Sequence, residues 1–96
     1  MRTFNEYMIE NLKNHEEARA YLKVVFEEYG KDNDYAALML SFRFVIEAQG
    51  GITALAERTG LNRQNLYKIL TSKSVLRFDT FTKLLKGLGF VITISI

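Results

Sequence analysis

The sequence predicts an all-α protein of six helices that ends in one short C-terminal β-strand. Two observations favour the helices: apolar residues recur at steps of three and four, and no proline interrupts the 96-residue chain. A third observation favours the strand, because apolar and β-branched residues alternate along residues 90–96. With 48% hydrophobic and 25% charged residues, the composition excludes wholesale disorder.

Capping signals predict where the first two helices start and stop. Thr3 with Glu6 is a capping box, in which each residue satisfies a free N–H group of the other at a helix start. Asn14 with Glu17 repeats this spacing and predicts a second helix, which we expect Gly30 to end. A polar turn is expected after it, at residues 31–34. The other expected helices cover residues 4–12, 35–49, 52–59, 63–70 and 78–88.

The third segment allows two interpretations. From Tyr35 onwards, Leu38, Phe42 and Val45 follow one another at three- and four-residue steps, which indicates a helix that ends at the next glycine pair. Within it, residues 40–46 also alternate between apolar and other side chains, as a strand would. The longer pattern favours the helix.

Residues 52–70 have the spacing of a helix-turn-helix. Ala56 is small where two steeply crossing helices must approach closely. Gly60 can adopt the left-handed conformation that ends the first helix. Leu61 is expected to be buried in the turn, and Asn62 to cap the second helix with its side-chain oxygen.

The second helix of this pair is predicted to carry a DNA-reading face. If Leu66 and Ile69 point inwards against Leu55 and Ala56, a basic face without carboxylates points outwards. Arg and Gln are suited to guanine and adenine edges in the major groove, and Lys and Thr to phosphates. The alternative is an ordinary helical hairpin in a bundle. The outward set is Arg63, Gln64, Tyr67, Lys68 and Thr71, with Lys73 expected to contact phosphates just beyond the helix.

Charge is unevenly divided along the chain. Residues 1–49 hold six Lys/Arg against nine Asp/Glu, a net charge of −3, and residues 50–96 hold seven against two, a net charge of +5. This asymmetry predicts two partners of opposite charge. The alternative is that solvated faces happen to be segregated in this way.

Other functional classes lack the residues they need. The chain has no cysteine, and its single histidine, His15, has no second histidine for a triad or metal cluster. No Gly-rich phosphate loop, signal peptide or membrane-length apolar run is present. We therefore expect no enzyme activity, metal or cofactor, and a cytoplasmic protein without a membrane partner.

Residues 50–70 and 78–89 together resemble the HigA-like addiction-module antidote proteins, which are phage-repressor-like antitoxins. Residues 7–12 and 16–22 also resemble the opening segment of that family. The resemblance implies a lambda-repressor-like helix-turn-helix bundle that neutralises a RelE-like ribonuclease toxin and represses its own operon as a dimer. It places Arg63, Gln64, Asn65, Tyr67 and Lys68 on the recognition helix and Thr53 at the start of the preceding one. Residues 72–76 replace a Gly-Asn-Pro-like loop of the family, which affects the expected phosphate contacts there.

These observations predict an antitoxin that binds double-stranded operator DNA and a cognate small basic toxin. The alternative is a stand-alone helix-turn-helix transcriptional regulator. We expect a single domain, residues 1–96, made of acidic N-terminal helices (1–49), a helix-turn-helix core (50–89) and the strand (90–96). Toxin binding is assigned to the acidic half, whose candidate residues are Glu6, Glu10, Glu16, Glu17, Glu27 and Glu28.

The strand is expected to mediate homodimerisation. Phe90, Ile92, Ile94 and Ile96 would form one apolar face, and an unpaired strand edge readily recruits a second chain. Pairing of two copies would place two recognition helices on successive major grooves and predicts a palindromic operator. Alternatively, the strand extends a sheet of the toxin and the free protein is monomeric.

Overall fold

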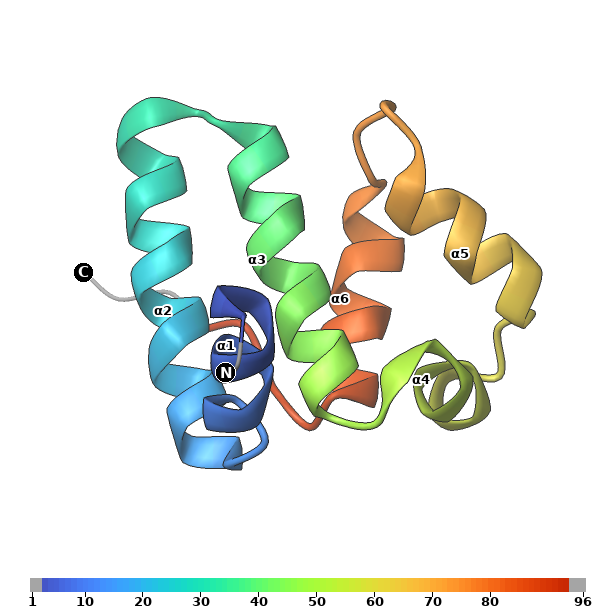
Figure 1. Cartoon of the computed structure of the whole chain (residues 1–96). Helices are drawn as coiled ribbons and strands as arrows, with labels where there is room; N and C mark the ends of the chain where they lie inside the picture. Colours follow the sequence, from blue (N-terminus) through green and yellow to red (C-terminus); the bar gives the residue numbers. More distant parts are fainter. Residues whose placement is uncertain (1–2, 94–96) are drawn as a thin grey trace. The chain divides into compact units, whose positions relative to one another are not determined.

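The computed structural model describes residues 3–93, and all regular structure in that range is α-helix (Figure 1). The all-α prediction is therefore confirmed, with every expected helix present. The helices are α1 (Phe4–Asn11), α2 (His15–Asp32), α3 (Tyr35–Ala48), α4 (Gly51–Thr59), α5 (Arg63–Thr71) and α6 (Phe78–Gly87).

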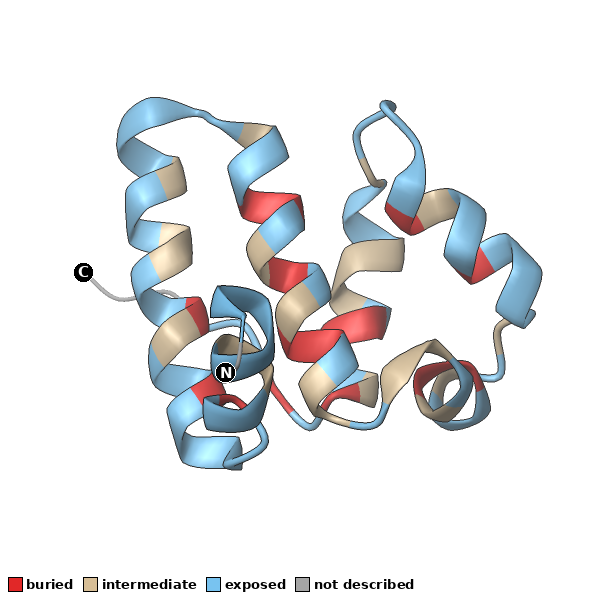
Figure 2. Cartoon of the chain, in the orientation of Figure 1, coloured by how far each residue is buried: buried red, intermediate tan, exposed pale blue. Residues whose placement is uncertain are grey.

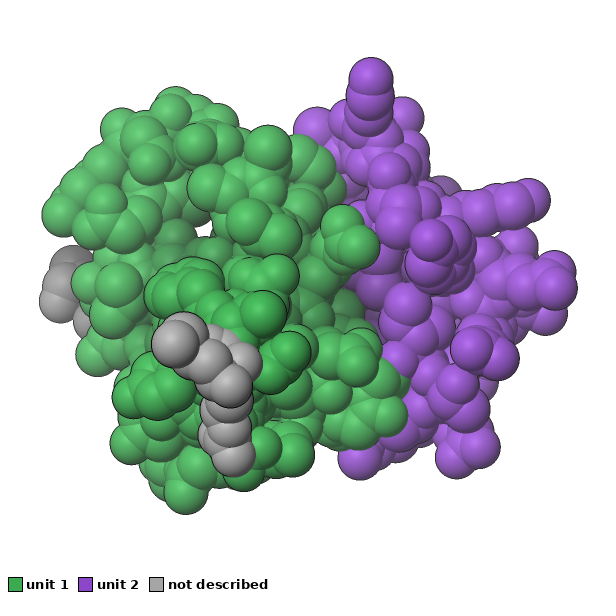
Figure 3. All heavy atoms as spheres, viewed as in Figure 1, with its two compact units in different colours: residues 1–51 green, residues 52–96 purple. Residues whose placement is uncertain are grey.

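The chain divides into two compact units, Met1–Gly51 and Ile52–Ile96, coloured separately in Figure 3. We call them the N-terminal and the C-terminal unit. The first carries the net negative charge and the second the net positive charge found in the sequence. The expected organisation as one domain stays a prediction.

Both predicted cap residues of the N-terminal unit cap their helices, which confirms one of the two bonds of each predicted capping box. The Thr3 hydroxyl accepts the N–H of Glu6 at 3.1 Å, and the Asn14 side-chain oxygen accepts the N–H of Glu17 at 3.0 Å. Each bond satisfies one of the N–H groups that a helix start leaves without an intrahelical partner. The starts of α1 and α2 are thus explained by residues three positions apart in the sequence.

The predicted end of α2 at Gly30 is wrong. The helix continues through Gly30 to Asp32, so half of the expected polar turn is helical. Asn33 ends it instead, with a φ of 54° and its N–H donating to the Tyr29 carbonyl at 2.9 Å. Asn tolerates this left-handed conformation because its short polar side chain can hydrogen-bond locally.

Helix α3 is the central helix of the N-terminal unit and packs against both α1 and α2. The strand alternative for residues 40–46 is wrong, because the whole segment is helical. Its alternating pattern reflects a helix that is apolar around much of its circumference, as a central helix must be. The buried residues of α3, visible in red in Figure 2, are Leu38, Met39, Phe42, Val45 and Ile46.

One side chain joins the end of α3 to the turn between α1 and α2. The Gln49 amide, at the C-terminal cap of α3, donates to the carbonyls of Leu12 at 2.7 Å and Lys13 at 3.2 Å. These carbonyls follow the last turn of α1, where no helical N–H is available to them. The Gln49 side-chain oxygen lies 3.3 Å from Nδ1 of His15 at the start of α2.

The C-terminal unit is built from α4, α5 and α6 around leucines. Leu55, Leu66 and Leu84, one from each helix, are at most 1% exposed. Gly87 in the last turn of α6 lies so close to α4 that a methyl group added there would meet the Thr59 side chain at 2.6 Å. The absence of a side chain at Gly87 therefore allows α4 and α6 to pack together.

The expected C-terminal strand is wrong for residues 90–93, which form no regular structure. The N–H of Gly89 donates to the Lys86 carbonyl, and the N–H of Phe90 donates to the Leu85 carbonyl at 2.9 Å. With Gly89 at a φ of 88°, this is a Schellman motif, which ends α6.

In that motif Phe90 is buried as part of the helix end, whereas Val91 is 82% exposed. Residues 90–93 therefore form no strand through which two copies could pair, and the predicted strand-paired homodimer is wrong there. Residues 94–96 lie outside the described part of the chain.

Candidate nucleic-acid interface

The turn between α4 and α5 is fixed by side chains that follow one another in the sequence. Gly60 has a φ of 73°, and its N–H donates to the Ala56 carbonyl at 2.9 Å, as expected for a glycine that ends a helix. The Thr59 hydroxyl donates to the Leu55 carbonyl at 2.8 Å and accepts the N–H of Leu61 at 3.3 Å. These hydrogen bonds fix the turn, and the turn sets the direction of α5 relative to α4.

Asn62 caps α5 as predicted. Its side-chain oxygen accepts the N–H groups of Gln64 at 2.9 Å and of Asn65 at 3.2 Å. Two of the N–H groups that a bare helix start would offer to a phosphate are therefore already bonded. The α5 start contributes to an interface mainly by positioning its side chains.

The inward face of α5 differs in one residue from the predicted one. Leu66 is fully buried, as expected, and Leu55 and Ala56 of α4 are buried too. Ile69 is only half-buried, and Leu70, which the sequence interpretation did not assign, is buried instead. Leu66 and Leu70 are four residues apart, so both lie on one face of the helix.

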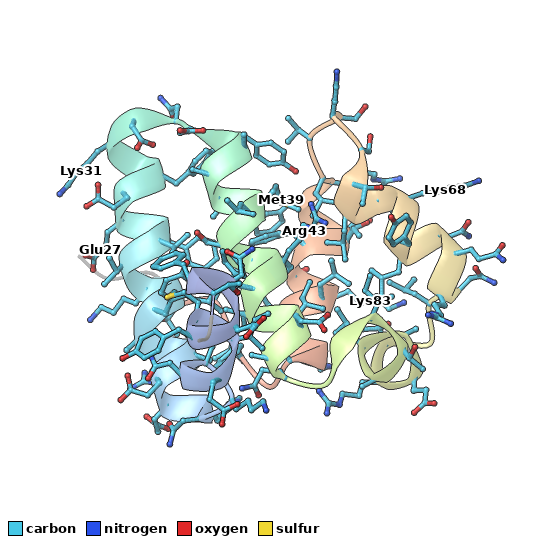
Figure 4. The ribbon with its side chains drawn as sticks, in the orientation of Figure 1. Glu27, Lys31, Met39, Arg43, Lys68 and Lys83 are labelled. Atoms are coloured by element: carbon cyan, nitrogen blue, oxygen red, sulfur yellow. The ribbon has the colours of Figure 1, made fainter. Side chains whose placement is uncertain are left out.

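All eight predicted DNA-contacting residues are exposed. They are Thr53, Arg63, Gln64, Asn65, Tyr67, Lys68, Thr71 and Lys73. The long Lys68 side chain projects from α5 away from the rest of the unit in Figure 4. The Thr71 hydroxyl donates to the Tyr67 carbonyl at 2.9 Å, which holds it against its own helix.

Four of these residues meet in one open hollow. It is lined by Arg63, Gln64, Tyr67 and Lys68 of α5, together with Asn62 and with Ile52 of α4, and we call it the α5 hollow. The other four predicted residues do not line it. Ile52 and Asn62 were not among the predicted contacts, because the sequence indicated only structural roles for them.

No carboxylate lines the α5 hollow. In the described part of the C-terminal unit, residues 52–93, the only carboxylates are Glu57 and Asp79. Asp79 forms an ion pair with Arg77 at 3.2 Å. An anionic ligand at α5 would therefore meet two cationic side chains, two amides and a phenol ring, without local repulsion.

Comparison with known families identifies the chain. A family model described as "probable addiction module antidote protein" matches residues 2–96. The chain belongs to this family. An addiction module antidote counteracts a toxin, so membership implies a toxin partner. Searches of curated proteins and of solved structures gave no match.

Residues 3–93 contain no group of three or more His, Asp or Glu residues placed to hold a metal ion. No single helix in the same range is long and apolar enough to cross a membrane, and only α3 and α4 taken together reach that length and composition.

Proposed function

We propose that this antidote protein has two binding activities in the cytoplasm. It represses its own operon by inserting α5 into the major groove of operator DNA, and it neutralises a RelE-like ribonuclease toxin through its acidic N-terminal unit. The observation that carries the DNA-binding proposal is the α5 hollow, which is exposed, bears two cationic side chains and lacks carboxylates.

Sequence-specific contacts are assigned to the first turn of α5. An α-helix about 10–12 Å across fits the B-DNA major groove, about 12 Å wide. Arg63 is suited to pair with the two acceptors of a guanine edge, and Gln64 with the donor and acceptor of an adenine edge. Asn65 is a second amide that would reach bases or phosphates from the same turn.

Phosphate contacts are assigned to the remaining exposed residues. Lys68 lies five residues beyond Arg63, about 7.5 Å further along the helix axis, so the two reach different points on the DNA. Tyr67 offers a hydroxyl group beside it, and Thr71 would offer its own on release from the Tyr67 carbonyl. Thr53 lies near the start of α4, and Lys73 follows α5. Such contacts fix the position of a protein on DNA and supply most of its affinity.

Binding to DNA from upstream of the protein's own gene tests this assignment. Arg63→Ala or Gln64→Ala should weaken specific binding by about 1–3 kcal/mol, because a paired base contact is lost. Lys68→Ala should weaken binding to every sequence and reduce its salt dependence. Lys86→Ala on α6 removes the same charge outside the α5 hollow and serves as the matched control.

The DNA-binding proposal is overturned if a variant combining the Arg63, Gln64 and Lys68 substitutions shifts promoter DNA as well as the Lys86 control does. A protein that binds DNA but does not counteract a toxin would be the stand-alone regulator instead. Family membership argues against that alternative.

Toxin neutralisation is assigned to the N-terminal unit on grounds of charge. A ribonuclease needs a basic surface to hold RNA, and an acidic partner would cover that surface and associate with it quickly. In this unit three ion pairs, Lys13–Glu10, Arg19–Glu16 and Lys31–Glu28, link exposed side chains three residues apart. Pairs of this kind contribute little stability, so their carboxylates remain available to a partner.

Co-expression with the neighbouring reading frame tests this half of the proposal. The wild-type chain should restore growth in cells that express that gene, and the two proteins should co-purify. Their association should slow as salt concentration rises, because screening removes the long-range attraction. Failure of the wild-type chain to restore growth or to bind that gene product would overturn the toxin proposal.

A further inference from the structure

A second open hollow lies in the N-terminal unit, where α1 ends and α2 begins. It is lined by Tyr7, Glu10 and Asn11 of α1, by the cap residue Asn14 and by Glu17 of α2. We call it the α1–α2 hollow. Its lining combines an aromatic ring, two amides and two carboxylates, and no lysine or arginine lines it.

The helix that forms one wall of this hollow leaves its aromatic residues uncovered. Phe4 is 73% exposed and Tyr7 is 63% exposed, and α1 has no buried residue of its own. The two rings are three residues apart, so they lie on neighbouring positions of one helix face. Exposed aromatic side chains beside polar groups are the typical composition of a protein-binding surface.

The two carboxylates of the hollow differ in their ion pairs. Glu10 is paired with Lys13 at 2.9 Å, with both side chains more than half exposed. Among residues 3–93, Glu17 forms no ion pair. The N–H of Glu17 is bonded to the Asn14 side chain, so the position of this residue in the first turn of α2 is fixed.

We infer that the α1–α2 hollow is the docking site for an arginine side chain on the basic surface of the toxin. The inference rests on the proposed toxin binding and specifies which part of the acidic unit performs it. A guanidinium group stacks on aromatic rings and pairs with carboxylates through two parallel hydrogen bonds. It would lie against Tyr7 and pair with Glu17, while Phe4 is covered by apolar toxin surface.

Charge complementarity favours a basic partner over a neutral or acidic one. The unit has a net charge of −3, so a cationic surface is attracted before contact, whereas an acidic protein is repelled. A second copy of this chain is the competing occupant, because its C-terminal unit is basic. Toxin binding by calorimetry and the mass of the free protein by light scattering separate the two occupants.

The experiment uses the full-length chain and the purified product of the neighbouring reading frame. Calorimetry should show that Glu17→Lys and Tyr7→Ala each weaken binding by about tenfold or more, since each removes one side of the arginine site. Tyr7→Phe keeps the ring and should bind within about threefold of wild type. Because Tyr7 and Glu17 are exposed, circular dichroism should show that the variants keep their helix content.

Glu47→Lys is the matched control, at a carboxylate that is not among the residues assigned to toxin binding. Glu47 is exposed on α3 of the same unit and does not line the hollow. Its substitution changes the net charge of the unit as Glu17→Lys does. We expect it to weaken toxin binding by less than about threefold, so the difference between the two variants isolates the local contact.

Each result decides one question. If the wild-type chain does not bind the toxin, the proposed toxin binding fails and this inference fails with it. If the toxin binds and Glu47→Lys and Glu17→Lys weaken binding equally, the acidic unit acts as a whole and the α1–α2 hollow is not the site. If Tyr7→Ala and Glu17→Lys bind like wild type, the site is also wrong. If light scattering without toxin shows that Glu17→Lys splits a dimer, the occupant is a second copy.

Discussion

Replacing Gly87 by alanine should destabilise the protein, although alanine is the better helix former. An alanine methyl group at this position would lie 2.6 Å from Cγ2 of Thr59 and 3.0 Å from Cδ1 of Leu55. Thr59 cannot easily rotate away, because its hydroxyl donates to the Leu55 carbonyl and accepts the N–H of Leu61. Leu55 is buried, so its side chain has little room to move away from the methyl group.

The expected loss follows from two opposing effects. Glycine to alanine inside a helix gains about 1 kcal/mol of helix propensity. Forcing an extra methyl group into a packed contact costs about 1–3 kcal/mol. The contact here is closer than any methyl group tolerates, which places the cost in the upper part of that range. We therefore expect Gly87→Ala to lower the free energy of unfolding by about 1–2 kcal/mol.

A double-mutant cycle with Thr59→Ser identifies the cause. Serine keeps the hydroxyl of Thr59 and removes the methyl carbon that meets the new group. In the Thr59→Ser background, Gly87→Ala should be neutral or stabilising, a coupling of about 1 kcal/mol or more. Urea denaturation followed by circular dichroism measures all four proteins. The packing argument is refuted if Gly87→Ala stabilises the wild-type chain by its full helix propensity and shows no coupling to Thr59.

Three other changes test local features of the fold. Asn62→Asp should leave the helix cap and the melting temperature intact. It should weaken operator binding in a gel-shift assay, because it places a carboxylate in the α5 hollow. Unchanged DNA affinity would contradict the assignment of that hollow. Gln49→Ala should lower the free energy of unfolding by about 1–2 kcal/mol, because the Leu12 carbonyl loses its partner, and a urea midpoint equal to wild type would show that water replaces the bond. Phe90→Ala should cost about 3 kcal/mol in the same measurement, whereas Val91→Ala should cost less than about 0.5 kcal/mol; equal effects would be inconsistent with the helix end described above.

The sequence predicted best those features that depend on residues close together in the chain. The N-terminal caps Thr3, Asn14 and Asn62 each bond to an N–H group two or three residues ahead, so a short spacing carries all the information. The left-handed Gly60 belongs to the same class. These features required no knowledge of which helices pack together.

The end of α2 shows where such local reasoning fails. Gly30 and Asn33 can both adopt the left-handed conformation, and helix propensity alone favours stopping at the glycine. The chain instead continues for two more residues and turns at Asn33. Asp34 follows at once as the cap of α3 by accepting the N–H of Ala37 at 3.1 Å. The sequence interpretation considered Gly30 alone and did not weigh Asn33 and Asp34 together as a helix end followed by a helix start.

The strand predicted for residues 90–93 was wrong for a related reason. Alternation between apolar and β-branched residues is typical of a strand, but a strand needs a partner for its N–H and C=O groups. In this chain the N–H of Phe90 is already bonded to the Leu85 carbonyl, so it cannot begin a ladder. The apolar residue that follows a helix-ending glycine is a regular part of the Schellman motif. Gly89 followed by Phe90 was therefore a helix-end signal as much as a strand signal.

The candidate interface combines both kinds of feature. Exposure of Arg63, Gln64 and Lys68 follows from helical periodicity once Leu66 is placed inside, and this much was predicted from the sequence. The hollow itself depends on Ile52, eleven residues before Arg63, which approaches α5 only because the turn at Gly60 sets the direction of the second helix. An exposed basic face occurs on many soluble helices. A basic face that forms a hollow with the preceding helix and contains no carboxylate is more specific to DNA-binding helices. We therefore expect α5 to be the helix that binds the operator.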